Sequence, residues 1–321
     1  MPSFVDRLTS LNVILPDIMH SSRFFTGFMI GVFDSGSGGL TILSALKVSF
    51  PEADFLYLGD HARAPYGERS AEEIYEFTRQ TVDWLFNKGA DLVILACNTA
   101  SSVALRKLQQ EWLPSNHLNK RVLGILVPTV EVLTEVSWKH PEQSSINGVI
   151  GILATPATVV SGAYVREVQK RAPNVDVVQT ACPTLVPFIE AGEKEKAWHD
   201  MKGYLDDVLQ KMEVTGKDKC GLLLGCTHYA LLADLVRDYV GNYVKVIDQG
   251  SVTSGALEMY LKREVLRENW GRGTGKIILS TTNKTAPTVS VFGNDFAESE
   301  WVCGIKLMAQ KILQRKSSFP E

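Results

Sequence analysis

Short apolar runs alternate with longer amphipathic stretches along most of the chain after residue 28. The apolar runs end in small or polar residues, and helical periodicity follows most of them. Continuous runs of this length are typical of parallel strands that are covered on both faces. The expected strands lie at 29–36, 55–60, 91–97, 121–127, 148–154, 175–182, 220–226 and 244–250. A repeated order of strand and helix predicts α/β layers joined by right-handed crossovers.

One helix has clear start and stop signals. Ser70 and Glu73 have the spacing of a capping box, and Gly89 stands where a C-terminal cap is expected. Between them an apolar stripe recurs with helical period. Its members are Ile74, Phe77, Thr78, Thr81 and Leu85. The pattern predicts a helix that begins after Ser70 and ends near Gly89.

A faint internal repeat divides the chain. The segment LVILACNTA (92–100) resembles LLLGCTHYA (222–230), and an earlier strand with a polar end precedes each of them, at 31–36 and 151–158. Two similar halves predict two doubly wound α/β domains with parallel sheets that face a central cleft. Open α/β sheets bind ligands outside the carboxyl ends of their strands, so the cleft is the expected site.

Composition narrows the class of protein. A chain of 321 residues has the length of about two domains. Hydrophobic residues make up 45% and charged residues 21%, which excludes a disordered chain. The net charge of -3 gives no basic surplus for nucleic acid, and no apolar run is long enough to span a membrane. Five cysteines without a C-x-x-C pair favour a reduced, cytoplasmic compartment over a disulfide scaffold or zinc knuckle.

Two of the cysteines stand in equivalent places. Cys97 and Cys226 each end an apolar run, and polar residues that should open a helix follow. A helix N-terminus favours a thiolate, and lowering a thiol pKa by about 1.5 units requires only about 2 kcal/mol. We therefore expect both thiols to have lowered pKa values. Either cysteine alone would be interpreted as a small buried apolar residue, but the equivalent pair indicates chemistry.

Two thiols from opposite sides of one cleft suit a symmetric task. One thiolate could remove a proton from one face of a carbon while the other thiol delivers a proton to the opposite face. A zinc site is disfavoured because Cys226 and His228 do not have a familiar ligand spacing. A Cys–His hydrolase would leave the second cysteine without a role.

The Gly-rich turn DSGSGGL (34–40) does not match a phosphate loop. Thr41 stands where a dinucleotide fingerprint needs its third glycine, and no Gly-Lys-Ser/Thr follows. Asp34 would repel a phosphate; it suits a substrate ammonium group, or it orients the neighbouring thiol. Ser35 and the backbone N–H groups suit a carboxylate.

Other polar residues give weaker signals. The loop at 61–70 has the composition of a surface turn. Thr155 and Thr158 could present hydroxyls to an anion or cap a helix, and His228 could tune Cys226 or lie in the core. Glu190 alone has the appearance of an ordinary helix-end acid. The remaining cysteines lack polar flanks and are interpreted as structural: Cys182, Cys220 and Cys303.

Taken together, these motifs resemble those of bacterial glutamate racemases. GVFDSGSGGL, PYG, LACNTAS, SGAY, ACPTLVPFIEAG and LGCTHYALL occur in that family in this order, and here they span about residues 30 to 250. The Cys-Thr-His form differs from the Cys-Thr-Glu of the related aspartate racemases. The resemblance implies interconversion of L- and D-glutamate without cofactor or metal, a supply of D-glutamate for peptidoglycan, a cytoplasmic location and a homodimer.

The resemblance also assigns site residues by motif. Cys97 and Cys226 would be the acid/base pair, Asp34 would assist Cys97, and Glu190 with His228 would assist Cys226. The implied substrate contacts are Asp34, Ser35, Tyr66, Gly67, Asn98, Thr99, Thr155, Thr227 and His228.

The resemblance implies two domains, of which the first is formed by two separate segments of the chain. Residues 29–125 together with 231–321 would form the first domain, and 126–230 the second. Residues 1–28 would be an N-terminal extension like that of some Gram-negative members, which a peptidoglycan precursor activates, or the product of an upstream start codon. The extension has no motif that aligns, and Ser37 stands where the family usually has an aliphatic residue.

Three alternatives remain open from the sequence. The first is a racemase of aspartate or another amino acid on the same fold. The second is a non-catalytic binding protein that keeps the fold, against which the retention of both cysteines argues. The third is a nucleotide-dependent oxidoreductase, which the failed glycine fingerprint disfavours.

Overall fold

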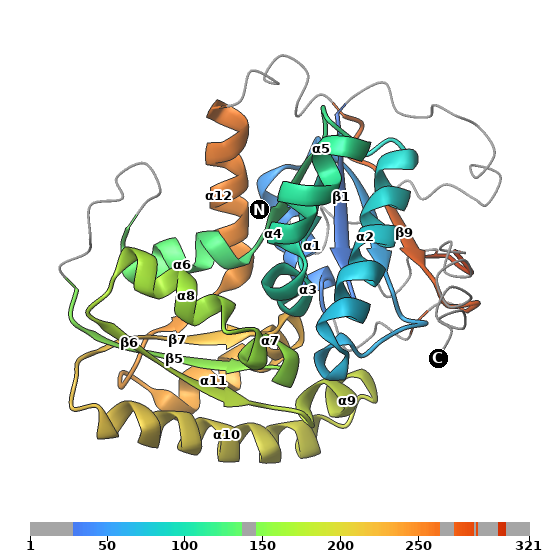
Figure 1. Cartoon of the computed structure of the whole chain (residues 1–321). Helices are drawn as coiled ribbons and strands as arrows, with labels where there is room; N and C mark the ends of the chain where they lie inside the picture. Colours follow the sequence, from blue (N-terminus) through green and yellow to red (C-terminus); the bar gives the residue numbers. More distant parts are fainter. Residues whose placement is uncertain (1–27, 137–145, 264–272, 286, 288–300, 306–321) are drawn as a thin grey trace, which may run out of the picture.

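Two parallel sheets organise the computed structural model, which describes residues 28–136, 146–263, 273–285, 287 and 301–305 (Figure 1). The larger sheet has six strands in the order β10-β9-β2-β1-β3-β4. Its strands are β1 (Met29–Asp34), β2 (Asp54–Gly59), β3 (Leu92–Leu95), β4 (Arg121–Gly124), β9 (Ile277–Thr281) and β10 (Trp301–Val302). The fold class expected from the sequence is confirmed.

The smaller sheet repeats the topology of the larger one. Its order is β6-β5-β7-β8, and its strands are β5 (Gly148–Ala154), β6 (Val175–Ala181), β7 (Lys219–Gly225) and β8 (Val246–Ile247). In each half the first strand pairs with both the second and the third strand, so both sheets share the order 2-1-3-4. The internal repeat of the sequence is therefore a repeat of topology.

Helices cover both faces of the six-stranded sheet. On one face α1 (Leu40–Ser49) and α12 (Gln249–Arg263) contribute to an apolar core with β1 and β2. On the other face α2 (Ala71–Asn87) packs with the helical segment that follows β3. That segment consists of α3 (Asn98–Val103), α4 (Leu105–Lys107), a π-helical turn (Leu108–Trp112) and α5 (Leu113–Asn116).

The four-stranded sheet is covered in the same way. One face packs against α9 (Leu185–Glu190), α10 (Lys194–Val214) and α11 (Ala233–Val240), and the other against α6 (Leu126–Thr134) and α8 (Ala163–Arg171). Figure 1 shows α10 along the outer side of this half. Short helices lie at the strand ends: η3 (Tyr66–Glu68), α7 (Pro156–Ser161) and η5 (Thr227–Leu232).

The helix expected after Ser70 is confirmed as α2. The Ser70 hydroxyl accepts a hydrogen bond from the Glu73 N–H at 3.2 Å, and the Glu73 carboxylate accepts one from the Ser70 N–H at 3.1 Å. Gly89 has a φ of +105°, a conformation that glycine adopts without steric cost. The local sequence alone therefore determines both ends of this helix.

Some strand boundaries differ from the expected ones. The run at 121–127 is a strand only to Gly124, because Leu126 already opens α6. The run at 244–250 contains the two-residue strand β8, and α12 begins at Gln249. A continuous apolar run does not distinguish a buried strand from the start of a buried helix. The strands β9 and β10 were not predicted.

The chain passes from one half to the other twice. It enters the four-stranded half at α6, whose Leu126 and Val130 pack in that core. Val236 and Val240 of α11 pack in the core on the other face of the same sheet, and β8 pairs with β7. Residues 233–247, which the resemblance assigned to the first domain, thus pack with the second. We propose a return crossing after Ile247. Residues 1–27 of the expected extension lie outside the described part.

Within the described residues, no helix combines the length and the apolar character that a bilayer span requires.

The capping box of α2 makes a prediction about stability. Replacing Ser70 by Ala removes the acceptor for the Glu73 N–H, so the free energy of unfolding should fall by about 1 kcal/mol. Thermal or urea denaturation measures this loss. Ser70→Asp keeps a side-chain acceptor and should retain most of the stability; equal losses in both variants would show that the cap contributes little.

Candidate active site

A cavity of about 370 Å³ lies where the two halves meet. Its wall comes from both sheets, at the carboxyl ends of their strands, as the sequence predicts. Lining residues from the six-stranded half include Ser35, Gly36, His61, Tyr66, Gly67, Glu68, Cys97, Asn98 and Thr99. Those from the other half include Thr155, Cys182, Pro183, Val186, Glu190, Cys226, Thr227 and His228.

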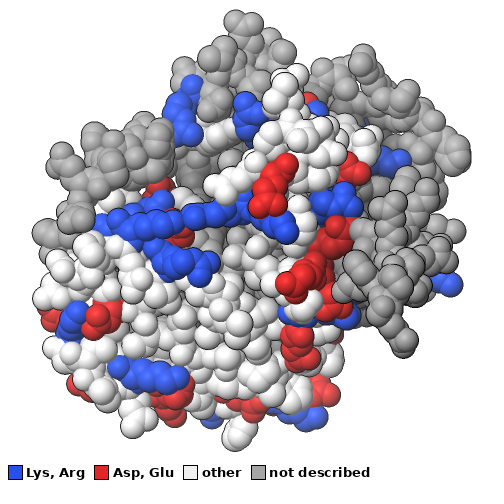
Figure 2. Space-filling model, in the orientation of Figure 1, with Lys and Arg blue, Asp and Glu red and all other residues white. Residues whose placement is uncertain are grey.

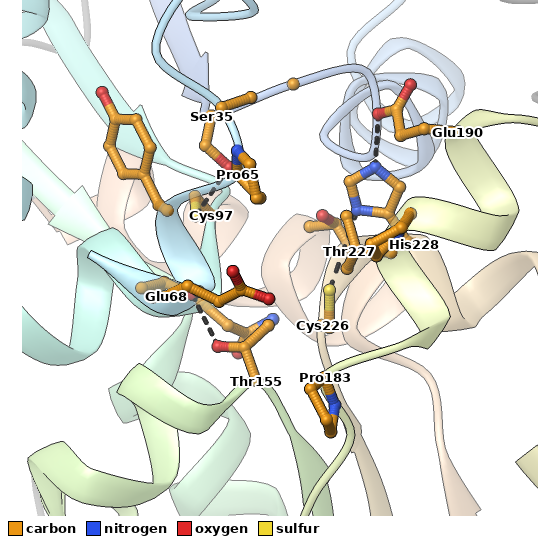
Figure 3. A pocket seen from close by; sticks show the side chains of 18 of the residues that line it. Ser35, Pro65, Glu68, Cys97, Thr155, Pro183, Glu190, Cys226, Thr227 and His228 are labelled. Atoms are coloured by element: carbon orange, nitrogen blue, oxygen red, sulfur yellow. Dashed lines mark hydrogen bonds and ion pairs between the residues drawn. The ribbon is translucent and has the colours of Figure 1, made fainter. Parts of the chain in front are cut away.

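The two cysteines occupy matching positions in the two halves. Cys97 follows β3 and is the N-cap of α3, while Cys226 follows β7 and is the N-cap of η5. Their exposed fractions are 5% and 7%. Figure 3 shows their sulfur atoms on opposite sides of the cavity. A small molecule between them would therefore have one thiol on each side.

Burial dominates the electrostatics of Cys97. Loss of water around the sulfur, together with the nearby charge of Asp34, raises the pKa of this thiol to about 12. The Ser35 hydroxyl, 3.5 Å from the sulfur, and the Ala100 N–H oppose the shift without cancelling it. The expectation of a lowered pKa is wrong for Cys97, because desolvation outweighs a helix end of six residues.

Cys226 has a different neighbour. His228 Nδ1 lies 3.7 Å from the Cys226 sulfur, and His228 Nε2 lies 2.6 Å from Glu190 Oε1 (Figure 3). Burial alone would lower the pKa of His228, but the hydrogen bonds to Cys226 and Glu190 raise it well above its ordinary value. Burial would raise the pKa of Glu190, yet His228 holds it below the usual range. A cationic imidazole thus faces the Cys226 sulfur.

Asp34 lies behind the wall of the cavity. Its side chain is fully buried; Oδ1 accepts the Gly36 N–H at 2.9 Å and Oδ2 accepts the Thr227 hydroxyl at 3.2 Å. Burial raises its pKa, although the charge of His228 opposes that shift. Asp34 is absent from the cavity lining, whereas Thr227 belongs to it. Of the two roles left open by the sequence, this position favours orientation of neighbouring groups over an ammonium contact.

Three threonine hydroxyls meet at the other end of the cavity. Thr155 Oγ1 lies 2.9 Å from Thr99 Oγ1 and 3.0 Å from Thr158 Oγ1, and the Thr99 and Thr158 hydroxyls are 3.3 Å apart. Thr155 precedes α7 but its side chain makes no capping bond. Because Thr99 and Thr155 line the cavity, the interpretation of Thr155 as an anion-binding hydroxyl is favoured over a helix cap.

The loop at 61–70 forms part of the cavity wall, contrary to its interpretation as a surface turn. Tyr66 and Gly67 are buried, and the Tyr66 hydroxyl donates a hydrogen bond to Asp60 at 2.5 Å. A Cβ atom on Gly67 would lie 2.8 Å from the Thr155 Cβ, so this close approach requires glycine. Tyr66 and Gly67 open a short helix, and their N–H groups have no partner within it.

Sequence reasoning missed His61, which also lines the cavity. Its Nε2 lies 2.9 Å from the Ser37 hydroxyl, and its Nδ1 lies 2.9 Å from Thr281 Oγ1 on β9. The Ser37 N–H donates to Glu190 at 3.2 Å. Ser37, the departure from the family pattern, therefore pairs with a histidine that no local motif marks.

The other cysteines differ from one another. Cys182 is buried and lines the cavity, but its thiol donates to the Thr180 carbonyl at 3.5 Å. Cys220 and Cys303 are partly buried and lie outside the cavity lining. Among the residues that the structure describes, no group of three or more His, Cys, Asp or Glu side chains has the arrangement of a metal site.

Comparison with known proteins identifies the class. The family model described as Asp/Glu/Hydantoin racemase matches residues 41–256, so the chain belongs to this family of isomerases, as its motifs predict. Within the family, it is 43% identical to the glutamate racemase of Ruegeria pomeroyi, covering 81% of this chain and 93% of that one. The glutamate racemase of Roseobacter denitrificans is 41% identical, with 80% and 92% covered.

A solved structure agrees with this assignment. The glutamate racemase of Francisella tularensis, crystallised in complex with D-glutamate, superposes with a TM-score of 0.71 at 28% identity. The match covers 88% of this chain and 98% of that one.

The pair of Glu190 and His228 predicts a measurable titration. Replacing Glu190 by Gln removes the carboxylate that favours the imidazolium, so the pKa of His228 should fall. An NMR titration of the His228 ring measures the change. Glu68→Gln is the control, because Glu68 also lines the cavity but is exposed to solvent. A pKa of His228 that stays unchanged in Glu190→Gln would contradict the assignment.

The same pair predicts a pH window for stability. The contribution of Glu190 is fully present above its unfolded pKa of about 4.5 and is lost as pH falls through the lowered folded pKa. That of His228 is fully present below about 6.5 and is lost as pH rises through the raised folded pKa. The stability difference between the wild type and Glu190→Gln should therefore be largest between these two values.

Proposed function

We propose that the protein interconverts L- and D-glutamate without a cofactor, with Cys97 and Cys226 as bases on opposite faces of the α-carbon. The observation that carries the proposal is the pair of strand-end thiols on opposite sides of one cavity. The similarity to glutamate racemases over most of the chain supports the choice of substrate. In this proposal the enzyme is cytoplasmic and supplies D-glutamate for peptidoglycan.

The two thiol environments suit opposite protonation states. Burial favours the neutral thiol at Cys97. We assign the role of the thiolate base to Cys226, because the cationic ring of His228 lies 3.7 Å from its sulfur. In this state Cys226 removes the α-proton and Cys97 donates its own proton to the other face. One turnover reverses the two protonation states, so each thiol serves as base in one direction and as acid in the other. The reverse reaction begins from the reversed state.

Neutral donors around the cavity support the carbanionic transition state. The α-proton of an amino acid is a very weak acid, so developing charge must meet preorganised hydrogen-bond donors in a site without bulk water. We assign one substrate carboxylate to the hydroxyls of Thr99 and Thr155 and the N–H groups of Tyr66 and Gly67. We assign the other to the neutral polar groups beside the cysteines: Ser35, Asn98 and Thr227.

Two further proposals rest on the resemblance alone. The homodimer is one of them, and activation by a peptidoglycan precursor through the N-terminal extension is the other. Residues 1–27 of that extension lie outside the described part of the chain.

Replacement of either reactive cysteine tests the chemistry. Cys97→Ser and Cys226→Ser exchange a thiol for a hydroxyl that is hardly ionised at neutral pH, so each should lose racemisation by about 10²-fold or more. Circular dichroism of L-glutamate, incubated with protein dialysed against a chelator, measures the rate; L-aspartate serves as the second substrate. Cys220→Ser and Cys303→Ser should keep normal rates. Near-normal activity in either reactive-cysteine variant would refute the mechanism.

Removal of one hydroxyl tests the carboxylate site. Thr155→Val keeps the size of the side chain but loses a hydrogen bond to a charged group, which contributes about 1.5–3 kcal/mol. KM for glutamate should therefore rise by about tenfold or more, with a smaller change in kcat. Thr158→Val is the matched control. The Thr158 hydroxyl belongs to the same cluster of three threonine hydroxyls, but Thr158 does not line the cavity. An equal or larger effect in the control would contradict the assignment.

A further inference from the structure

Gln249 stands where the chain returns from the four-stranded half to the six-stranded half. It is the first residue of α12 and lies two residues after β8. Figure 1 shows this end of α12 between the two halves. The Gln249 side chain is buried, with 7% of the residue exposed. It lies in the apolar run at 244–250, but none of the six family motifs includes it.

The Gln249 amide pairs with the amide of Asn98 in a closed ring. Asn98 Nδ2 donates to Gln249 Oε1 at 2.8 Å, and Gln249 Nε2 donates to Asn98 Oδ1 at 3.2 Å. Tyr164 on α8 donates a second hydrogen bond to Asn98 Oδ1 at 2.5 Å. Gln249 Nε2 also lies 3.1 Å from the hydroxyl oxygens of Thr129 and Tyr164. The network therefore connects Asn98 with helices of the opposite half.

The network uses only one of the two amide hydrogens of Asn98. Asn98 Oδ1 accepts two hydrogen bonds, and one N–H of Nδ2 donates to Gln249. The second N–H of Nδ2 has no partner among the described residues, although Asn98 is only 2% exposed. Asn98 also lines the substrate cavity beside Cys97. A buried donor without a partner is costly, so it fits a ligand that accepts a hydrogen bond.

We propose that Gln249 is a positioning residue that fixes the Asn98 amide with its free N–H toward a substrate carboxylate. Without Gln249 the amide can rotate by half a turn and present Oδ1, an acceptor that repels a carboxylate. The inference rests on the proposed function, because it takes Asn98 as a substrate contact. Gln249 itself does not line the substrate cavity, so in this proposal it acts on the substrate through Asn98.

The first test compares kinetic constants. Gln249→Ala should raise KM for glutamate by about five- to tenfold, with less than a twofold change in kcat. Ser254→Ala is the control on the same helix, since it removes a buried hydrogen bond to the Gly250 carbonyl at 3.0 Å without touching Asn98. KM should stay unchanged in the control. Equal KM values in Gln249→Ala and the wild type would overturn the inference.

The second test separates positioning from a structural role. In Gln249→Glu a protonated carboxyl can donate to Asn98 Oδ1 and accept from Nδ2, as the native amide does. An ionised carboxylate has no donor and repels Oδ1. The ratio of KM in this variant to KM in the wild type should therefore rise with pH, while the ratio for Gln249→Ala stays flat. Dividing by the wild-type KM removes the pH dependence that the two enzymes share.

Two outcomes of the second test decide the inference, even if Gln249→Ala folds poorly. A rising ratio supports positioning by hydrogen bonding. A flat ratio, whether near one or raised, overturns it. Asn98→Ala separates the substrate contact of Asn98 from the positioning role of Gln249. If Asn98→Ala leaves KM unchanged, the proposed substrate contact fails; if it raises KM while the Gln249 variants do not, only the role of Gln249 fails.

Discussion

Buried hydrogen bonds between the two halves hold the site together. Asp34 accepts from Thr227, the Ser37 N–H donates to Glu190, and the Thr99 hydroxyl meets that of Thr155. Each bond joins the surroundings of one thiol to the opposite half. Because the cysteines follow equivalent strands of two sheets with the same order, closing the halves along these bonds sets the sulfurs opposite each other. The cavity and the opposed positions of the two thiols depend on this closure.

The symmetry of the backbone does not extend to the electrostatics. Cys97 has the buried charge of Asp34 near it and a raised pKa, whereas Cys226 faces an imidazole paired with Glu190. In the proposed reaction, which runs in both directions, each thiol must exist in both protonation states. An asymmetric pair of thiols can do so if its two protonation states lie close in free energy. Substrate binding displaces water and adds charge, so it changes the free-energy difference between these two states.

Local patterns determined what the sequence could predict. The capping box at Ser70, the strand-end positions of Cys97 and Cys226, and the repeat between halves depend on neighbours in the chain, and they reappear in the structure. The pairing of His61 with Ser37 and Thr281, by contrast, includes a contact over 220 residues to a strand that was not predicted.

Dependence on contacts between distant parts of the chain also explains why two other features could not be predicted. The Gln249–Asn98 pair joins residues 151 positions apart, and no periodicity marks either amide as the partner of the other. The pKa of Cys97 could not be predicted because a helix N-terminus is visible in the sequence, while the loss of water around the sulfur is not. Desolvation is a property of the packed structure, and here it decides the direction of the shift.

Isotope transfer in heavy water tests the two-thiol account most directly. If different sulfurs remove and deliver the proton, D-glutamate first formed from L-glutamate carries deuterium at the α-carbon, and L-glutamate first formed from D-glutamate does so as well. Mass spectrometry of the separated enantiomers at early times measures the label. A product that retains the α-proton of its substrate would require a single base and would contradict the account.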